Sequence, residues 1–355
     1  MTISAHIREA QINADLSRWS TQTQELIRSG DHDACSVFNS YKNFMLRGEF
    51  DHIEMFVDPS KVSIDVGTNR GQYALKLASI SKGCLCIEPV KALGFVAKVL
   101  PNNCVYRSVA AGRARGVATI RIPSINGTFD YGQSTLATDN TLGGNEYEEQ
   151  TTEVTTVDEL VQECFPGEAV GFVKIDVEGF EEAVLEGSSE MLKRCKPNLQ
   201  IELHGGNKRI EWVTNFLGQL GYRGLFFFDG RLFDASLFDF KVHRATENEY
   251  NWRTKKGLKF DPARYVCDYI FIPIEKQMQP ISVQAGQLAD QQLADQHLPG
   301  NQKNELAENQ HLLKENERLL IEQERLMAEL LDSASWRITR PLRWGYEQLL
   351  KLKKS

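Results

Sequence analysis

Acidic and glycine residues gather where the first buried strand of the sequence ends. The stretch VSIDVGTNRGQYAL indicates a strand, a glycine turn and a helix, and its turn carries Asp65, Gly67, Asn69 and Gly71. Ligands of doubly wound sheets bind outside the carboxyl ends of the strands, so these four residues are candidates for a binding site. Glu88 ends the next strand, in CIEP, at a spacing that suits a carboxylate accepting from two ribose hydroxyls. The pattern therefore predicts a nucleoside site.

The spacing of the glycines restricts the class of nucleoside. Dinucleotide-binding turns follow G-x-G-x-x-G, and the middle glycine lets a pyrophosphate approach the backbone. The corresponding positions here are Gly67, Asn69 and Gln72, so two of the three glycines are missing. No Gly-Lys-Ser/Thr run of a phosphate-binding loop follows. The pattern favours a nucleoside without phosphates, such as S-adenosylmethionine, over a plain tight turn with Glu88 on the surface.

A second acidic turn follows a later apolar strand, in the run FVKIDVEGFEEAVLEGS. Asp176 and Glu178 are two residues apart and point the same way if the strand continues through them. The following strand, in PNLQIELH, places Glu202 and His204 on one face, with His204 at the carboxyl edge of the sheet. We expect Asp176, Glu178 and His204 to be catalytic.

Each of these residue types also has a simpler explanation. His204 is the best candidate base by its ordinary pKa, and Asp176 is second if its site is dry. His204 is otherwise a structural histidine, and the two acids otherwise cap a helix or face solvent. Together the three side chains resemble a set for Mg²⁺ or a softer ion, but we predict no metal. Ser134 and Thr135 either help to hold the ligand or form a simple turn.

These motifs together resemble the FkbM-type family of S-adenosylmethionine-dependent methyltransferases. The resemblance rests on IDVGTNRGQYAL, CIEP, VTTVDEL, VKIDVEGFEEAVLEGS and PNLQIELH, in that order, and covers residues 62–273. It implies a class I methyltransferase fold and a hydroxyl acceptor, commonly on a sugar or a secondary metabolite. Residues 124–150, a loop-rich polar stretch, are its least transferable part, and we expect them to face the acceptor.

The resemblance also implies roles for individual residues. Asp65, Gly67, Asn69 and Gly71 would line the methionine and ribose side of the cofactor, and Glu88 would take the ribose hydroxyls. Asp176 and Glu178 would lie near the transferred methyl group.

The elements that must position these residues indicate an α/β fold. We predict a doubly wound class I methyltransferase (Rossmann-like) sheet with a C-terminal helical coiled-coil extension. Thr156 or Asp158 would cap one helix, a single amphipathic helix would follow Glu178, and YRGLFFF would pair antiparallel with YVCDYIFIP. The predicted parts are an N-terminal helical segment (1–58), the methyltransferase domain (59–275), a Gln-rich linker (276–300), a coiled coil (301–332) and a basic aromatic tail (333–355).

The last two parts suggest partners. Leu312, Leu319 and Leu326 repeat every seven residues beside polar positions, as in a parallel coiled coil of marginal stability, so we expect a homodimer. In the tail, SASWRITRPLRWGYEQLLKLKKS mixes basic and aromatic residues, which suits an anionic membrane surface or an acidic partner rather than a helical cap on the coiled coil. The string S-x-S-W-R-x-T-x-P-L-R also resembles a terminal motif of bacterial surface-polysaccharide assembly enzymes.

The whole composition limits the remaining classes. A net charge of −7 argues against nucleic-acid binding, and we find neither a signal-peptide layout nor an apolar run of transmembrane length. Seven cysteines without Cys-x-x-Cys spacing indicate reduced thiols. We therefore expect a cytoplasmic protein, peripheral at the inner face of a bacterial membrane through its tail.

Three functions remain open. The first is an O-methyltransferase that acts on a hydroxyl of a sugar in a bacterial surface polysaccharide or its precursor. The second keeps the enzyme and changes the acceptor to a small secondary metabolite or a nucleotide sugar. The third is a catalytically retired scaffold in a glycan-assembly complex.

Overall fold

The structure is a computed structural model, and it describes residues 5–204, 207–228, 231–239, 243 and 266–275. The chain divides into two compact units, Met1–Gln277 and Met278–Ser355. All described residues belong to the first unit, so the predicted linker, coiled coil and basic tail lie outside them. None of the helices in the described ranges has the length and apolar character needed to cross a membrane.

An eight-stranded sheet forms the centre of this unit, in the order β11-β10-β12-β9-β8-β1-β2-β3. Five neighbouring strands are parallel: β1 (Val62–Val66), β2 (Gly83–Ile87), β3 (Cys104–Arg107), β8 (Val170–Ile175) and β9 (Asn198–Glu202). The remaining three extend the sheet through antiparallel pairs: β12 (Asp268–Pro273), β10 (Tyr222–Phe228) and β11 (Arg231–Asp234). The predicted pairing of YRGLFFF with YVCDYIFIP is thus confirmed.

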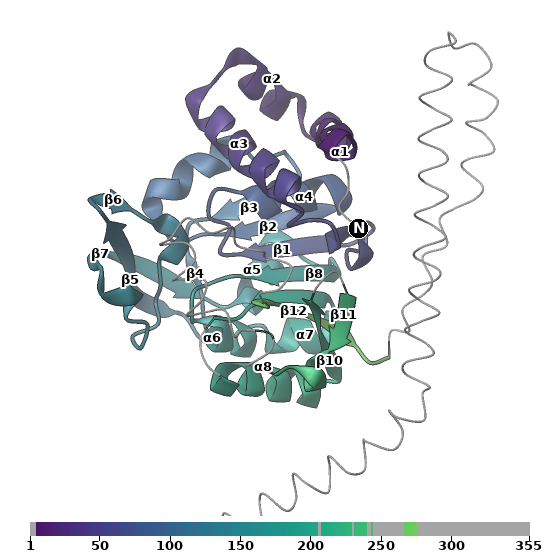
Figure 1. The fold of residues 1–355 in the computed structure, drawn as a ribbon, viewed down its shortest axis with the longest axis vertical. Coiled ribbons are helices and arrows are strands. Elements are labelled where there is room, and N and C mark those ends of the chain that lie inside the picture. The colour runs from purple at the N-terminus through teal and green to yellow at the C-terminus, as the bar shows by residue number, and fades with distance from the viewer. Residues whose placement is uncertain (1–4, 205–206, 229–230, 240–242, 244–265, 276–355) are drawn as a thin grey trace, which may run out of the picture. The chain divides into compact units, whose positions relative to one another are not determined.

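Helices cover both faces of the sheet, as the predicted doubly wound fold requires (Figure 1). The first face carries α1 (Ala5–Arg18), α2 (Thr21–Ser29), α3 (His32–Arg47), the 3-10 helix η1 (Ile53–Met55), α4 (Gln72–Ile80) and the 3-10 helix η2 (Lys91–Lys98). The second face carries α5 (Val157–Cys164), α6 (Glu181–Glu186), α7 (Ser189–Cys195) and α8 (Asn207–Gln219). Strand side chains alternate between the two cores, so Leu85 packs with the second group while Cys84 and Cys86 pack with the first. All seven cysteines are free thiols.

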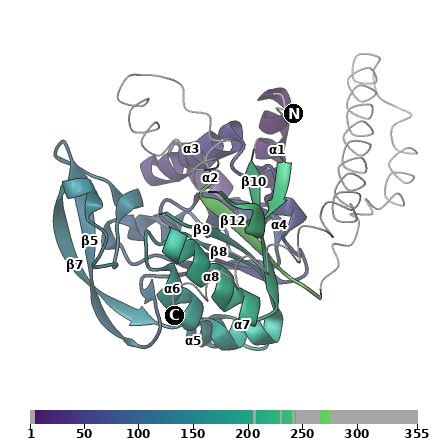
Figure 2. The ribbon, with the colours of Figure 1, turned by 60° about the horizontal axis from the view of Figure 1, so that its bottom comes forward.

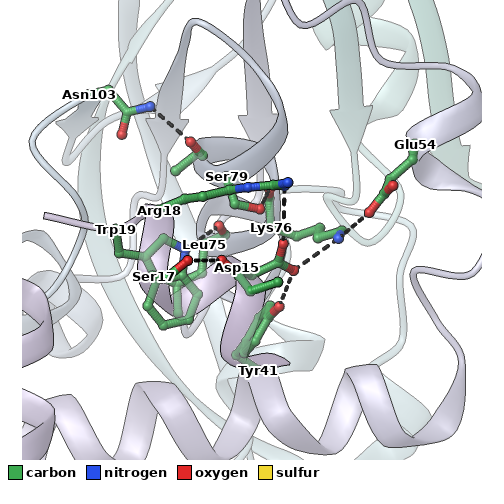
Figure 3. Close-up of polar contacts among 12 residues, drawn as sticks. Asp15, Ser17, Arg18, Trp19, Tyr41, Glu54, Leu75, Lys76, Ser79 and Asn103 are labelled. Carbon is green, nitrogen blue, oxygen red and sulfur yellow. Dashed lines mark hydrogen bonds and ion pairs between the residues drawn. The ribbon is translucent and has the colours of Figure 1, made fainter. Parts of the chain in front are cut away.

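A buried ion-pair network fastens the N-terminal helices to α4, the helix that follows the glycine turn (Figure 3). The Nζ atom of Lys76, whose side chain is 2% exposed, lies 2.9 Å from Asp15 Oδ2 and 2.5 Å from Glu54 Oε1. The hydroxyl of Tyr41 donates to the same Asp15 oxygen at 2.6 Å. A buried cation needs such partners, because an unpaired one would cost several kcal/mol. The predicted N-terminal helical segment therefore packs directly on the helix that positions the glycine turn.

A second, four-stranded sheet reaches into both ends of the stretch that we predicted to be loop-rich. Its order is β4-β7-β5-β6, with β4 (Ala110–Ala111), β5 (Gly116–Ile125), β6 (Thr128–Phe129) and β7 (Glu146–Thr155). The loop prediction for residues 124–150 is wrong at both ends, because β5 extends into it and β7 starts within it. Most side chains of β7 are exposed, so its sequence, EYEEQTTEVT, lacks the apolar alternation that marks a half-buried strand. The β5–β7 ribbon extends beyond the central sheet (Figure 2).

The helix predicted after Glu178 is broken into α6 and α7. A Cβ at Gly187, between them, would overlap with the carbonyl oxygen of Gly112, so only glycine fits at this break. Asp158 accepts hydrogen bonds from the first-turn amides of α7, those of Glu190 and Met191. Of the two cap candidates, it is Thr156 that caps α5, in a reciprocal capping box with Glu159.

Candidate active site

The candidate residues meet where the strand order of the central sheet reverses. From β1 the chain order runs to β2 and β3 in one direction, and β8 and β9 lie in the other. Ligands of open α/β sheets bind at such a switch point, outside the carboxyl ends of the strands. Here the turns after β1 and β8 touch, because the amide of Asp176 donates to the carbonyl of Val66 at 2.9 Å.

The glycine turn after β1 owes its glycines to contacts within the protein. Gly67 has a φ of +84°, and a Cβ there would overlap with the carbonyl oxygen of Asp176. Gly71, with φ +81°, begins α4, and its Cβ would lie 3.0 Å from Val96. Asn69 also takes a left-handed conformation, with φ +49°. Gly67 is therefore needed for the close approach of the β8 turn, whichever ligand the site binds.

Glu88 is buried rather than on the surface, and it braces this turn. Its Oε2 accepts from the Asn69 amide at 2.8 Å, and its Oε1 accepts from the Val90 amide at 2.8 Å. Burial raises the pKa of Glu88 to about 7, although the two amide hydrogen bonds oppose the rise. A carboxylate offers about four acceptor positions, so roughly two are left for a ligand that donates hydroxyl hydrogens.

Asp65 carries the clearest sign of a missing partner. Its side chain is buried, and its Oδ2 has no hydrogen-bond partner among the described residues. Burial raises the pKa of Asp65 to about 7, against the attraction of the Lys174 charge. Buried polar oxygens are nearly always hydrogen-bonded in folded proteins. An orphaned oxygen beside the acceptor positions of Glu88 fits a nucleoside ligand that brings its own donors.

We expected Asp176 and Glu178 to point the same way if the strand continued through them, but the chain turns after β8. The strand ends at Ile175, and Glu178 has a left-handed φ of +48°. The carbonyl of Glu178 accepts from Thr135 Oγ1 at 2.7 Å and from Asn140 Nδ2 at 3.2 Å. Thr135, which we placed either at the ligand or in a simple turn, thus ties its loop to the β8 turn.

His204 lies beside Glu202 at the end of β9. Its Nε2 is 2.7 Å from Glu202 Oε1, and both side chains are partly buried. Lys174 Nζ lies 3.5 Å from the other Glu202 oxygen and 2.9 Å from Asp268 Oδ1, so one buried lysine joins β8, β9 and β12. The amide nitrogen of Gln200 donates to the same Asp268 oxygen at 2.8 Å.

The pKa values of the acids in this group are shifted in different directions. Burial and the neighbouring Glu202 raise the pKa of Asp176 well above its ordinary value. For Glu202 itself, burial opposes ionisation, but the Lys174 charge and the His204 contact hold its pKa well below the ordinary value. Burial raises the pKa of Glu178 to about 7, against the attraction of His204. These opposite shifts favour the proton on Asp176 and the negative charge on Glu202.

Sequence reasoning missed the residues that organise this group, Lys174 and Asp268. The signal for Lys174 was present, because a lysine inside VGFVKI interrupts an otherwise apolar strand that is buried along its whole length. Asp268 gave no such signal, since its partners are 94 and 68 residues away in sequence. In the described residues, no group of three or more metal-ligating side chains is arranged to hold an ion, the set of Asp176, Glu178 and His204 included.

Comparison with known families finds a match over the part of the chain that holds these residues. Residues 65–224 match the family model described as the methyltransferase FkbM domain. The match covers both acidic turns, the second sheet and β9. No curated protein matches the chain.

Solved structures with some likeness are methyltransferases at low identity. The methyltransferase FkbM from Methylobacillus flagellatus KT is 14% identical with a TM-score of 0.36, over 75% of this chain and 59% of that one. The precorrin-6y C5,15-methyltransferase from Geobacter metallireducens GS-15 is 12% identical with a TM-score of 0.29, over 51% and 73%. The plantazolicin methyltransferase BamL, solved with a triazolic desmethylPZN analog and SAH, is 10% identical with a TM-score of 0.31, over 75% and 99%. The present chain thus spans less than two thirds of the first of these proteins.

Proposed function

We propose that the protein is an S-adenosylmethionine-dependent O-methyltransferase. One observation carries the proposal: the unpaired carboxylate oxygen of Asp65 and the braced carboxylate of Glu88 lie at the switch point, and β8 separates them from a histidine at the end of β9 that is held by a carboxylate. The family match over residues 65–224 supports the same cofactor. Asp65 and Glu88 would hold the amino-acid and ribose groups of the cofactor, with Gly67, Asn69 and Gly71 shaping the turn between them.

When bound, S-adenosylmethionine supplies a methyl group on a cationic sulfur. The acidic lining of the site favours a cation at that position, because nearby carboxylates stabilise positive charge. His204 would accept the proton of the acceptor hydroxyl, whose oxygen would receive the methyl group in exchange for the sulfur. A hydroxyl acceptor is favoured because it needs a base near neutral pH, which histidine provides.

A sugar is the acceptor class that the surroundings support best. An open pocket of about 380 Å³ lies between η2 and the second sheet, and the rings of Phe129 and Tyr131 stack beside it with centroids 6.3 Å apart. The carboxylate of Glu148 and the amide of Gln150 complete its lining. Aromatic surface with a few polar groups is typical of small-ligand sites. A Cβ at Gly132, next to Tyr131, would lie 3.4 Å from Asn69 Nδ2, so this loop adjoins the glycine turn.

The sequence of the tail extends the proposal to a surface polysaccharide or its precursor, with the enzyme acting as a homodimer at the inner face of a bacterial membrane. Deletion of residues 301–355 tests this extension. Loss of activity on a lipid-linked glycan, with activity on a soluble fragment retained, is the expected result. Unchanged activity on both would favour a nucleotide sugar or a small secondary metabolite as acceptor.

The first experiment is calorimetric titration of the purified protein with S-adenosylmethionine, S-adenosylhomocysteine and NAD. We expect micromolar binding of the first two and none of NAD. Replacement of Asp65 or Glu88 by Ala should weaken binding at least about tenfold, because each loses a charged hydrogen bond. Glu190→Gln, at an exposed residue of α7, is the matched control and should bind as the wild type does. Binding of none of the three ligands would favour the scaffold.

A further inference from the structure

Glu202 lies beside His204, and the proposed reaction has so far given Glu202 no role. Glu202 is the last residue of β9, and His204 lies two residues beyond it, on the same face. The 2.7 Å contact between His204 Nε2 and Glu202 Oε1 is short for a hydrogen bond between nitrogen and oxygen, as expected when the acceptor is a carboxylate. This contact fixes one nitrogen of the ring against the end of the sheet.

Glu202 is itself held in place from two other strands. Lys174 on β8 contacts its second oxygen at 3.5 Å and is tied to Asp268 on β12 at 2.9 Å. The ring of Tyr73 from α4 lies beneath the same ammonium, 4.9 Å away. With its neighbours on both sides fixed, the Glu202 carboxylate has little freedom to follow the ring if the ring moves.

The surrounding charges keep this carboxylate ionised. Charged groups from several elements face the pair. The acids near it are Glu49, Asp176, Glu178 and Asp268, and Glu181 and Asp130 face the adjoining Glu178. The cations are Lys174 and Arg209. The raised pKa of Asp176 favours its protonation, which lessens the negative charge around Glu202. Glu202 thus contacts His204 through one oxygen and Lys174 through the other.

We propose that Glu202 is a positioning residue that holds the imidazole of His204 by Nε2 and so fixes both its orientation and its tautomer. Because an ionised carboxylate can only accept, the ring hydrogen resides on Nε2, and Nδ1 carries the basic lone pair. This inference rests on the proposed function, in which His204 receives the hydroxyl proton. Glu202 thereby acts on the reaction through the histidine.

The test follows the ring of His204 by NMR, through the nitrogen and carbon-bound hydrogen signals of the imidazole during a pH titration without ligand. The spectrum of His204→Gln assigns the signal among the seven histidines. In Glu202→Gln we expect the pKa of His204 to fall by about one pH unit, as removal of an adjacent opposite charge requires, and the two neutral tautomers to mix. Glu190→Gln should leave both readings as in the wild type.

A second variant covers the case in which Glu202→Gln does not fold. Glu202→Asp keeps the charge but withdraws it from the ring, so the pKa of His204 should fall less while the tautomers still mix. A wild-type pKa and a single wild-type tautomer in either folded variant would overturn the proposal.

Binding of S-adenosylmethionine separates this inference from the proposed function. We expect Glu202→Gln to bind the cofactor within about twofold of the wild type, because Glu202 ends β9, which β8 separates from the turn that would hold the cofactor. With an acceptor in hand, the acidic limb of its pH–rate profile should move to lower pH by the same shift that NMR records. A wild type that binds no cofactor but shows the coupled titration would refute the enzyme and leave the pair intact.

Discussion

The site has two halves. The β1 half consists of the turn after β1 and Glu88 just after β2, and the β8 half consists of the turn after β8 with Glu202 and His204 at the end of β9. The two halves hold their acidic side chains differently. In the β1 half, Glu88 accepts from the amides of Asn69 and Val90, which lie 19 and two residues away in the chain. In the β8 half, Glu202 is held by two side chains, those of Lys174 on β8 and of His204 two residues further on. The first half is held by backbone amides, whereas the second depends on charged side chains, one of them on the neighbouring strand.

This difference determines how each half responds to change. Backbone amides keep their place as long as the turn folds, so the β1 half is sensitive to backbone geometry. A buried ion pair loses its balance when one partner is removed, so the β8 half is sensitive to charge. Four measurements sharpen or break this contrast.

The largest effect should come from Gly67→Ala, which joins both halves. The left-handed φ and the overlap with the Asp176 carbonyl together should cost more than about 4 kcal/mol of the free energy of unfolding. Gly30→Ala is the control, with φ +77° and no atom within 4 Å of its Cβ, and should cost about 1 kcal/mol. Chemical denaturation measures both, and equal costs would show that the close approach is unimportant.

Lys174→Met should lower the free energy of unfolding by about 3 kcal/mol, because it leaves Glu202 and Asp268 without their buried cation. Uptake of a proton by one of these acids limits the loss. Lys82→Met, which removes an exposed pair with Glu168, should cost less than about 1 kcal/mol. Similar losses in the two variants would contradict the dependence of the β8 half on charge.

The pH dependence of stability should follow from carboxyls whose pKa is raised to about 7 by burial, Asp65, Glu88 and Glu178. Between their unfolded pKa, near 4, and about 7 the folded state binds more protons, so stability falls as pH rises through this window. We expect each of these carboxyls to contribute a loss of about 2 kcal/mol between pH 5.5 and 8 in the ligand-free protein. Glu88→Gln should flatten the curve, whereas a rise in stability over this range would contradict the assignment.

The smallest effect should come from Thr135→Val, in the loop that reaches the β8 turn. It removes a donor to the Glu178 carbonyl and an acceptor for the Ala137 amide, at a cost of about 1 kcal/mol. Thr128→Val, on the exposed strand β6, should be neutral within about 0.5 kcal/mol. Thermal melting of both variants gives the comparison, and a neutral Thr135→Val would mean that the loop is held by other contacts.

The same contrast explains what could be predicted from the sequence. The strand, turn and helix around Asp65 were predictable, because apolar runs, glycines and caps act over a few residues. The positions of β10 and β12 were predictable for the same reason. The break at Gly187 was not, because it depends on the carbonyl of Gly112, and β7 was not, because its exposed strand carries no apolar alternation. The partnership of Lys174 with Asp268 connects residues 94 positions apart, beyond the reach of any local pattern.

Lys174 also lies within electrostatic reach of both halves, since its charge lowers the proton affinity of Asp65 as well as that of Glu202. Occupation of the β1 half by a cation and protonation in the β8 half are therefore thermodynamically linked, and linkage is reciprocal. Ligand binding should release or take up a fraction of a proton, which makes the measured heat of binding depend on the ionisation heat of the buffer. A single buried ammonium thus couples the charge states of the two turns.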